Sequence, residues 1–398
     1  MKNFIFVSPN FPETYWRFCL ALKNRGFNVL GIGDAPYNEI PEGCKFSLTE
    51  YYCCPNMDNY ENEKRAVQYF IDKYGPIDFI ESNNEFWLEK DAHLRSDFNI
   101  PNGIRFEEIN KFKLKSEEKK YYEEAGCKVA RYCLANSLND VLKLGKECGY
   151  PLFAKPNNGV GAQGTYKIEN ENDVKKFFSE KPKGVEYIVE EYVNGCIVSF
   201  DGVSNSKGDV IFEASNVFTP SCADIVKLNL DDMYYCLPKV PDDLHKIGTK
   251  VIKAFNVQNR FFHCEYFRLL EDHPYLGKKG SIVALEANMR PAGGYTPDLI
   301  DFANSISVYD VYADSIAYDE NREDLTKEKF YAITSSRRNA IKYTHSPDDI
   351  FEKYRNDICM YGNYPKAISD DMGDYYFFAK FKTLKEAQDF DEFVRQKI

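Results

Sequence analysis

The stretch that decides the fold runs from Pro151 to Asn170 and reads PLFAKPNNGVGAQGTYKIEN. Gly159, Gly161 and Gly164 form a GxGxxG pattern, which is typical of dinucleotide-binding loops. In those loops a helix must follow the glycines, because its N-terminus carries the phosphate. Here the segment TYKIEN follows, with β-branched and aromatic residues alternating with polar ones, which predicts a second strand. The glycines are therefore expected at the tip of a hairpin.

A lysine precedes this hairpin. Protein kinases also fold a glycine hairpin over phosphates, but their lysine follows the loop and the chain carries HRD and DFG motifs. In this sequence Lys155 lies on the incoming strand, and neither motif occurs. The pattern alone leaves a plain flexible hairpin open, so that residues elsewhere must decide its role.

Composition excludes several classes of protein. The 398 residues carry a formal net charge of -11 and no basic run, which argues against nonspecific nucleic-acid binding. The twelve cysteines are scattered apart from Cys53 and Cys54, so reduced thiols are expected rather than disulfides or zinc sites. The sequence has neither an export signal nor an apolar run long enough to span a membrane, which predicts a cytoplasmic protein.

The first hundred or so residues alternate short apolar runs with amphipathic helical stretches. Such alternation predicts a parallel sheet covered by helices. The turn after the first strand holds Pro9 and Pro12 where a dinucleotide fold needs glycines, so the nucleotide site is expected elsewhere. A charged helix over Asn110–Gly126, a strand over Cys127–Ala135 and, after Asn194, longer strands in hairpin order are predicted next.

The segment SIVALEANMRPAGG, residues 281–294, predicts a strand with one chemical face. Strict alternation of side chains puts Glu286, Asn288 and Arg290 on one face. Alternation puts apolar residues on the other face, namely Val283, Leu285, Ala287 and Met289. Carboxylate and amide oxygens suit Mg²⁺, and a second acid is available at Glu265 in the preceding strand. A surface edge strand with incidental charges is the alternative.

Taken together, these motifs resemble the ATP-grasp superfamily, in particular its carboxylate-amine ligases and biotin-carboxylase-like enzymes. The resemblance spans most of the chain and rests on several motifs in order. It implies an α/β, Rossmann-like N-terminal domain preceding the ATP-grasp domain, and an α+β ATP-grasp domain of two lobes with antiparallel sheets. The implied boundaries are 1–110 for the first domain, 111–192 for the linker helix and small lobe, and 193–398 for the large lobe with a C-terminal subdomain.

The resemblance also implies roles for particular residues. Lys115 and Lys155 match the two ATP lysines, and the three glycines match the mobile loop over the phosphates. The segment YIVEEYV matches the hinge that reads adenine, which points to Glu190, Glu191 and Val193. Arg290 matches the arginine that stabilises the acyl phosphate, and the Mg²⁺ or Mn²⁺ ligands are matched by Glu265, Glu286 and Asn288.

Two positions depart from the family pattern. Ile197 stands where many members carry a ribose-binding glutamate, and Asp201 is the expected substitute. Leu114 stands where an acid often precedes the first lysine, so Lys113 or Lys119 remains an alternative to Lys115.

The function that the resemblance implies is ATP-dependent ligation of a small carboxylate to an amine through an acyl phosphate. A bicarbonate-using carboxylase and a catalytically silent nucleotide-binding protein stay open as alternatives, and a homodimer stays open as an assembly. The sequence does not decide the role of four further side chains, which are expected to lie on the surface: Lys227, Arg268, Arg337 and Arg338. His263 is expected to be a packed strand residue rather than a ligand.

Overall fold

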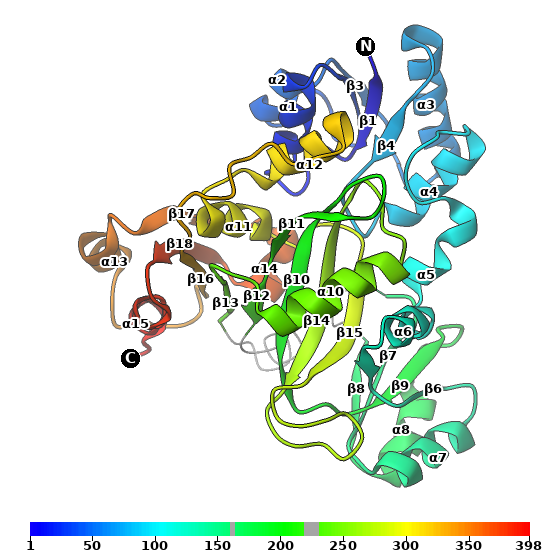
Figure 1. Cartoon of the computed structure of the whole chain (residues 1–398), viewed down its shortest axis with the longest axis vertical. Helices are drawn as coiled ribbons and strands as arrows, with labels where there is room; N and C mark the ends of the chain where they lie inside the picture. The colour runs from blue at the N-terminus through cyan, green and yellow to red at the C-terminus, as the bar shows by residue number, and fades with distance from the viewer. Residues whose placement is uncertain (160–163, 219–230) are drawn as a thin grey trace.

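The computed structural model describes residues 1–159, 164–218 and 231–398. Its strands form three sheets, one near each end of the molecule and a larger one between them (Figure 1). This arrangement confirms the predicted N-terminal α/β domain followed by lobes with antiparallel sheets. Gly161 and Lys227 lie outside the described residues.

The N-terminal sheet is parallel, with strand order β3-β2-β1-β4. Its strands are β1 (Asn3–Val7), β2 (Asn28–Gly33), β3 (Glu50–Cys53) and β4 (Phe79–Glu81). Its helices are α1 (Trp16–Asn24), α2 (Glu42–Ser47), α3 (Tyr60–Tyr74) and α4 (Leu88–Asp97). All residues of β1 and β4 are buried, as expected for parallel strands covered on both faces.

The small sheet contains the glycine hairpin and has the order β6-β9-β7-β8. Its strands are β6 (Tyr132–Leu134), β7 (Leu152–Pro156), β8 (Tyr166–Ile168) and β9 (Tyr187–Glu191). Helices α7 (Leu138–Cys148) and α8 (Glu171–Glu180) cover it, and a capping box between Ser137 and Asp140 starts α7. Strands β7 and β8 pair antiparallel, which confirms the prediction of a strand after the glycines.

The large sheet runs β17-β18-β16-β13-β12-β10-β14-β15-β5, with β11 paired to β10. Its central strands are β10 (Gly195–Ser204), β11 (Val210–Ala214), β12 (Asn216–Phe218), β13 (Met233–Cys236), β14 (Arg260–Leu269) and β15 (Ile282–Asn288). Its outer strands are β5 (Lys128–Val129), β16 (Tyr331–Arg337), β17 (Ile358–Asn363) and β18 (Tyr375–Phe381). All its pairs are antiparallel except β15 with β5. The predicted strand over Cys127–Ala135 is therefore wrong: β5 joins this sheet and β6 joins the small one.

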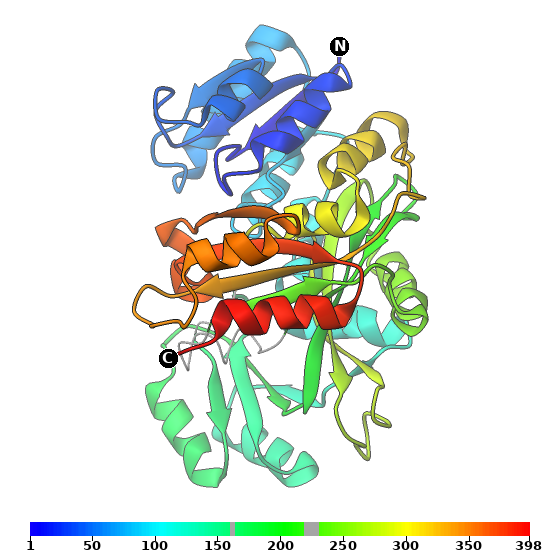
Figure 2. The same cartoon turned by 90° about the vertical axis from the view of Figure 1, so that its left-hand side faces the viewer.

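Further helices connect and cover these sheets. They are η1 (Phe106–Glu108), α5 (Asn110–Lys113), α6 (Lys115–Glu124), α10 (Asp242–Ala254), α11 (Thr296–Asn304), α12 (Val308–Tyr318), α13 (Pro347–Tyr354), α14 (Lys366–Met372) and α15 (Leu384–Arg395). Helix α15 crosses the front of the large sheet in Figure 2, with the N-terminal sheet above and the small sheet below. One apolar core joins α1 to α12 and to the large sheet, so the N-terminal domain packs directly on the large sheet and its helices. Within the described residues, no helix combines the length and the apolar character needed to cross a membrane.

The predicted continuous helix over Asn110–Gly126 is wrong, because the chain breaks at Leu114. There the backbone is extended, with φ -99° and ψ 112°. The Lys115 N–H donates to the Asn157 carbonyl at 3.0 Å, and the Ser116 N–H donates to Asn157 Oδ1 at 2.9 Å. Asn157 directly follows strand β7, so a residue of the small sheet caps the start of α6. This contact draws Lys115 toward the glycine hairpin.

The predicted alternation along residues 281–290 is also wrong at its first half. Glu265 pairs with Glu286, but the next residue of β14, Tyr266, pairs with Ala284. Leu285 is the extra residue of a β-bulge, and each residue before it changes face. Val283 therefore shares a face with Glu265 and Glu286 instead of lying with Ala287 and Met289.

Candidate functional site

Two acids lie opposite each other on neighbouring strands of the large sheet, near the edge formed by β5. Glu265 of β14 and Glu286 of β15 are direct cross-strand partners, so their side chains lie on one face of the sheet. Asn288 follows on the same face, opposite His263. The side chains of Glu265 and Glu286 keep 19% and 22% exposure, so they remain accessible to a ligand. The three side chains bring hard oxygen donors together.

Lys115 joins this face from helix α6. Its Nζ lies 2.8 Å from Glu286 Oε1 and donates to the Gly159 carbonyl at 3.1 Å. Burial lowers the pKa of Lys115, but Glu286 and Glu118 more than offset that, and the pKa is raised overall. Burial raises the pKa of Glu286, whereas Lys115 and Lys155 lower it, with a net decrease. Both groups are therefore held in their charged forms.

Lys155 of β7 belongs to a second ionic group. Its Nζ lies 2.7 Å from Glu190 Oε2, and the other oxygen of Glu190 pairs with Lys119. Burial raises the pKa of Glu190, but Lys119 and Lys155 outweigh it and lower that pKa to about 2. Lys115 and Lys155 thus occupy different ion pairs, and Lys119, the alternative to Lys115, pairs with Glu190 instead.

Glu191 and Val193, the predicted hinge residues, make different kinds of contact. Glu191 turns to Arg131, whose backbone N–H donates to Oε1 and whose Nε donates to Oε2, each at 2.8 Å. Val193 lies in an apolar cluster with Ala130, Leu269, Leu276 and Val283, and Phe267 packs against it. Phe267 lies two residues beyond Glu265 on the same strand, so this apolar cluster and the acid pair share one face of the sheet.

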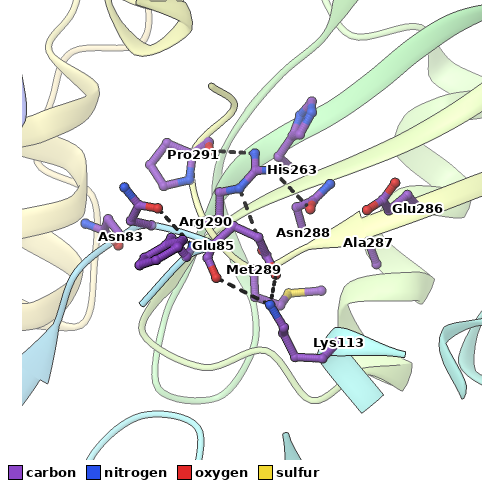
Figure 3. A network of polar contacts seen from close by, with 12 residues as sticks. Asn83, Glu85, Lys113, His263, Glu286, Ala287, Asn288, Met289, Arg290 and Pro291 are labelled. Atoms are coloured by element: carbon purple, nitrogen blue, oxygen red, sulfur yellow. Dashed lines mark hydrogen bonds and ion pairs between the residues drawn. The ribbon is translucent and has the colours of Figure 1, made fainter. Parts of the chain in front are cut away.

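Arg290 lies at the end of this face, beside the N-terminal domain (Figure 3). Its guanidinium donates to Asn288 Oδ1 at 3.1 Å and to the Pro291 carbonyl at 3.0 Å. Its Nε lies 3.7 Å from Oε2 of Glu85, which the loop after β4 contributes. Lys113, the other alternative to Lys115, donates to Glu85 Oε1 at 3.0 Å. Glu85 of the N-terminal domain therefore lies between two cations, Lys113 and Arg290.

Asp201 lies on the same face but is fully buried, with 0% exposure. It accepts from Asn216 Nδ2 at 2.8 Å and lies 2.6 Å from His263 Nδ1. His263 Nε2 in turn lies 3.4 Å from Glu265 Oε1. Burial lowers the pKa of His263, but Asp201 outweighs it and the pKa is raised to about 9. The expected ribose contact of Asp201 does not fit this geometry, since its carboxylate is enclosed beneath His263.

The three arginines that the sequence left without a role contact groups away from Glu265 and Glu286. Arg268 pairs with Asp243 at 2.7 Å, as expected of a surface position. Arg337 and Arg338 are 1% and 7% exposed, so the surface default is wrong for them. Arg337 donates to the Val394 and His345 carbonyls, and Arg338 donates to the Ser369 and Asp370 carbonyls at the end of α14.

The glycine loop is described at its two ends. The Gly159 carbonyl accepts from Lys115, as given above, and the Gly164 carbonyl accepts from the Tyr187 hydroxyl at 3.1 Å. Gly164 has φ +73°, a conformation that L side chains rarely adopt. Both ends of the loop are thus held by hydrogen bonds, one from α6 and one from β9.

Sequence reasoning missed Glu85 and its partner Lys113 as a pair. A signal was present, because the polar run ESNNE, residues 81–85, begins at the carboxyl end of the parallel strand β4. In open parallel sheets, ligands bind at that edge. What the sequence could not supply was the approach of this loop to Arg290, which lies 205 residues further along the chain by numbering.

Comparison with known proteins agrees with this geometry. The family model described as the ATP-grasp domain matches residues 120–273. The L-arginine-specific L-amino acid ligase of Bacillus subtilis is 23% identical over 253 residues, which cover 62% of this chain and 59% of that protein. The chain thus matches less than two thirds of the length of that relative.

Two solved structures share the fold over nearly the whole chain. The L-amino acid ligase of Bacillus licheniformis has a TM-score of 0.72 at 14% identity, covering 98% of this chain and 96% of its own. The biotin carboxylase of Campylobacter jejuni has a TM-score of 0.70 at 17% identity, covering 97% and 89%. The family match and these folds agree with the motifs in the sequence. Residues 120–273 therefore match the ATP-grasp domain, within an overall fold that the chain shares with these two enzymes.

Proposed function

We propose that this protein is an ATP-dependent ligase that activates a small carboxylate as an acyl phosphate and couples it to an amine, releasing ADP and phosphate. The observation that carries this proposal is the single sheet face on which Glu265, Glu286, Asn288 and Arg290 meet Lys115 of α6. We propose the boundaries 1–110, 111–192 and 193–398 for the three units of the chain.

The proposed ATP site lies between the two ATP-grasp lobes. The apolar cluster around Val193 suits the adenine ring, and the backbone of Glu191 to Val193 supplies hinge groups for its polar edge. Lys115 and Lys155 are positioned to exchange a carboxylate partner for phosphate oxygens, which accept charged hydrogen bonds equally well. Glu190 would keep Lys119 as its counter-ion when Lys155 turns to phosphate.

The acid pair fits a divalent cation. Glu265, Glu286 and Asn288 offer oxygens alone, and Mg²⁺ usually takes one or two carboxylates together with substrate phosphates. When bound, the cation would neutralise charge on the transferred phosphoryl group.

The protein's own residues then organise two transfers. A carboxylate oxygen of the substrate attacks the γ-phosphorus of ATP as the bond to ADP breaks, which gives the acyl phosphate. The amine nitrogen attacks the acyl carbon, phosphate leaves, and the amine loses a proton. Arg290 would hold the carboxylate or acyl-phosphate oxygens, because a guanidinium binds oxyanions in a fixed fork.

The pairing of Arg290 with Glu85 favours substrates that carry both charges. A carboxylate on Arg290 and an ammonium group on Glu85 would match the two ends of an amino acid. Bicarbonate has no cationic group for Glu85, so this contact favours the ligase over a bicarbonate-using carboxylase.

A phosphate-release screen tests the proposal. Purified protein with Mg-ATP is given amino acids and other small carboxylates and amines, singly and in pairs, with Glu286→Gln as the inactive control. A pair that releases phosphate when neither member does so alone supports a ligase. Bicarbonate-dependent release without another acid would support the carboxylase, and ATP binding with no release under any condition would support a silent nucleotide-binding protein.

A further inference from the structure

A buried ionic cluster joins the N-terminal sheet to the large sheet. Glu81, the last residue of β4, faces Arg260, the first residue of β14, although 179 positions separate them. Glu81 accepts from Arg260 through both oxygens, with the Nη2 contact at 3.0 Å, and also from Arg95 at 2.8 Å. The three residues are 5%, 2% and 0% exposed, in the order Glu81, Arg260 and Arg95.

The remaining nitrogen of Arg260 reaches the proposed catalytic strand. Its Nε donates to the Met289 carbonyl at 2.6 Å. Met289 lies between Asn288, a proposed metal ligand, and Arg290, and its own side chain is fully buried. Arg260 thus fixes the backbone at the point where both functional side chains leave the strand. All three nitrogens of its guanidinium are used, and a lysine could not make these contacts together.

Glu81 also holds the loop that contributes Glu85. Its Oε1 accepts from the backbone N–H groups of Ser82 at 3.0 Å and Asn83 at 3.1 Å. Asn83 has a left-handed backbone, with φ 54°, and 0% exposure, so its conformation depends on such contacts. Asp91 also accepts from the Ser82 N–H at 3.0 Å and the Ser82 hydroxyl at 2.6 Å. Glu81 therefore shares in holding the loop that leads to Glu85, and through Arg260 it also holds the strand that leads to Arg290.

We propose that Glu81 and Arg260 are positioning residues, which hold the Glu85 loop and the Asn288–Arg290 strand end in register so that Glu85 and Arg290 face each other. The catalytic part of this inference rests on the proposed ligase function. A buried ion pair is weak evidence for stability, because apolar residues of similar volume often stabilise a protein as well. An apolar replacement would lack the directional hydrogen bonds that this pair makes to the Glu85 loop and to the Asn288–Arg290 strand end.

The variants Arg260→Lys and Glu81→Gln test this role. A matched control is Arg25→Lys, because Arg25 also joins the N-terminal domain to the rest of the chain, with carboxylates of Asp310 and Asp314 each at 2.6 Å. Hydrogen–deuterium exchange needs no identified substrate. We expect Glu81→Gln to speed exchange in residues 286–292 and Arg260→Lys to speed exchange in residues 82–91, while Arg25→Lys changes neither segment. Exchange that changes only around the substituted residue would overturn the proposal.

Kinetics separate positioning from simple stabilisation. With a substrate pair from the release screen, Arg260→Lys should lower kcat by ~10-fold or more, because small misplacements of reacting groups are costly. The Kd for Mg-ATP should change much less than kcat, since Asn288 is the one proposed Mg-ATP contact next to the Met289 carbonyl that Arg260 holds. An equal loss of kcat in Arg25→Lys at a matched loss of Tm would also overturn the proposal. A parent protein that releases no phosphate would defeat the proposed ligase function, while the exchange experiment would still decide the coupling.

Discussion

Lys115 and Glu286 form an ion pair between the first residue of α6 and strand β15, with Nζ 2.8 Å from Oε1. The same Nζ donates to the Gly159 carbonyl, so one lysine of α6 contacts both Glu286 and the start of the glycine loop. If Lys115 turns to an ATP phosphate, Glu286 must find another cation. At the proposed site, this pair would therefore couple ATP binding to metal binding.

Removing the charge of Lys115 should weaken ATP binding. We expect Lys115→Met to raise the Kd for Mg-ATP by ~10- to 100-fold, the usual range for the loss of a hydrogen bond to a charged group. Titration calorimetry measures this change. Lys120→Met is the matched control, because Lys120 pairs with Glu117 on the exposed side of the same helix. Equal Kd values for the two variants would remove Lys115 from the ATP site.

Arg290 should matter for turnover more than for ATP affinity. We expect Arg290→Ala to lower kcat by ~10²-fold or more, the scale for loss of one electrostatic donor at a developing charge. The Kd for Mg-ATP should change little, and Arg290→Lys should restore part of the rate. Arg268→Ala serves as a control, because Arg268 pairs with Asp243 on the surface. Turnover of Arg290→Ala within a factor of about two of the parent would contradict its role.

Glu85 should discriminate between substrates with and without an ammonium group. We expect Glu85→Gln to raise KM by ~10-fold for the substrate that bears the ammonium group, because one charge-assisted contact is lost. The KM for ATP should be unaffected. The exposed acid Glu89 on α4 supplies the control variant Glu89→Gln. A Glu85→Gln variant with unchanged KM for every substrate would show that Glu85 serves only Lys113 and Arg290.

Features with a local cause could be predicted from the sequence. The hairpin around the glycines followed from TYKIEN alone, and the parallel sheet followed from alternating apolar and amphipathic runs. The acid pair followed from residue types on two neighbouring strands. In each case the residues that determine the structure lie close together in the chain.

Features that depend on residues far apart in the chain could not be predicted from the sequence. The break at Leu114 depends on Asn157, which satisfies the first N–H groups of α6 from another sheet. The bulge at Leu285 depends on the pairing register between β15 and β14. The sequence of β15 alone contains no signal for it. The meeting of Glu85 with Arg290 depends on how the N-terminal domain packs, to which the buried Glu81 and Arg260 pair contributes.

A buried acid in the N-terminal domain should make stability fall with rising pH. Glu63 of α3 is 1% exposed, and within the described residues neither of its carboxylate oxygens has a hydrogen-bond partner. Lys90 is its nearest cation, with Nζ 3.9 Å from Oε1. Burial raises the pKa of Glu63 to about 8, and Lys90 offsets this only in part. The folded protein therefore retains a proton that the unfolded chain releases above its ordinary pKa of 4.5.

The sign of the effect follows from that difference in bound protons. The folded state binds more protons than the unfolded state between the two pKa values, so stability declines as pH rises through that window and the loss is complete above the folded pKa. Glu63→Gln, which cannot ionise, should raise Tm relative to the parent at about pH 9 by several degrees more than at about pH 5. Thermal unfolding at both pH values measures this, with Glu61→Gln on the exposed side of α3 as the control. A Tm difference that does not grow with pH would mean that Glu63 is ionised in the folded protein, with Lys90 as a sufficient partner.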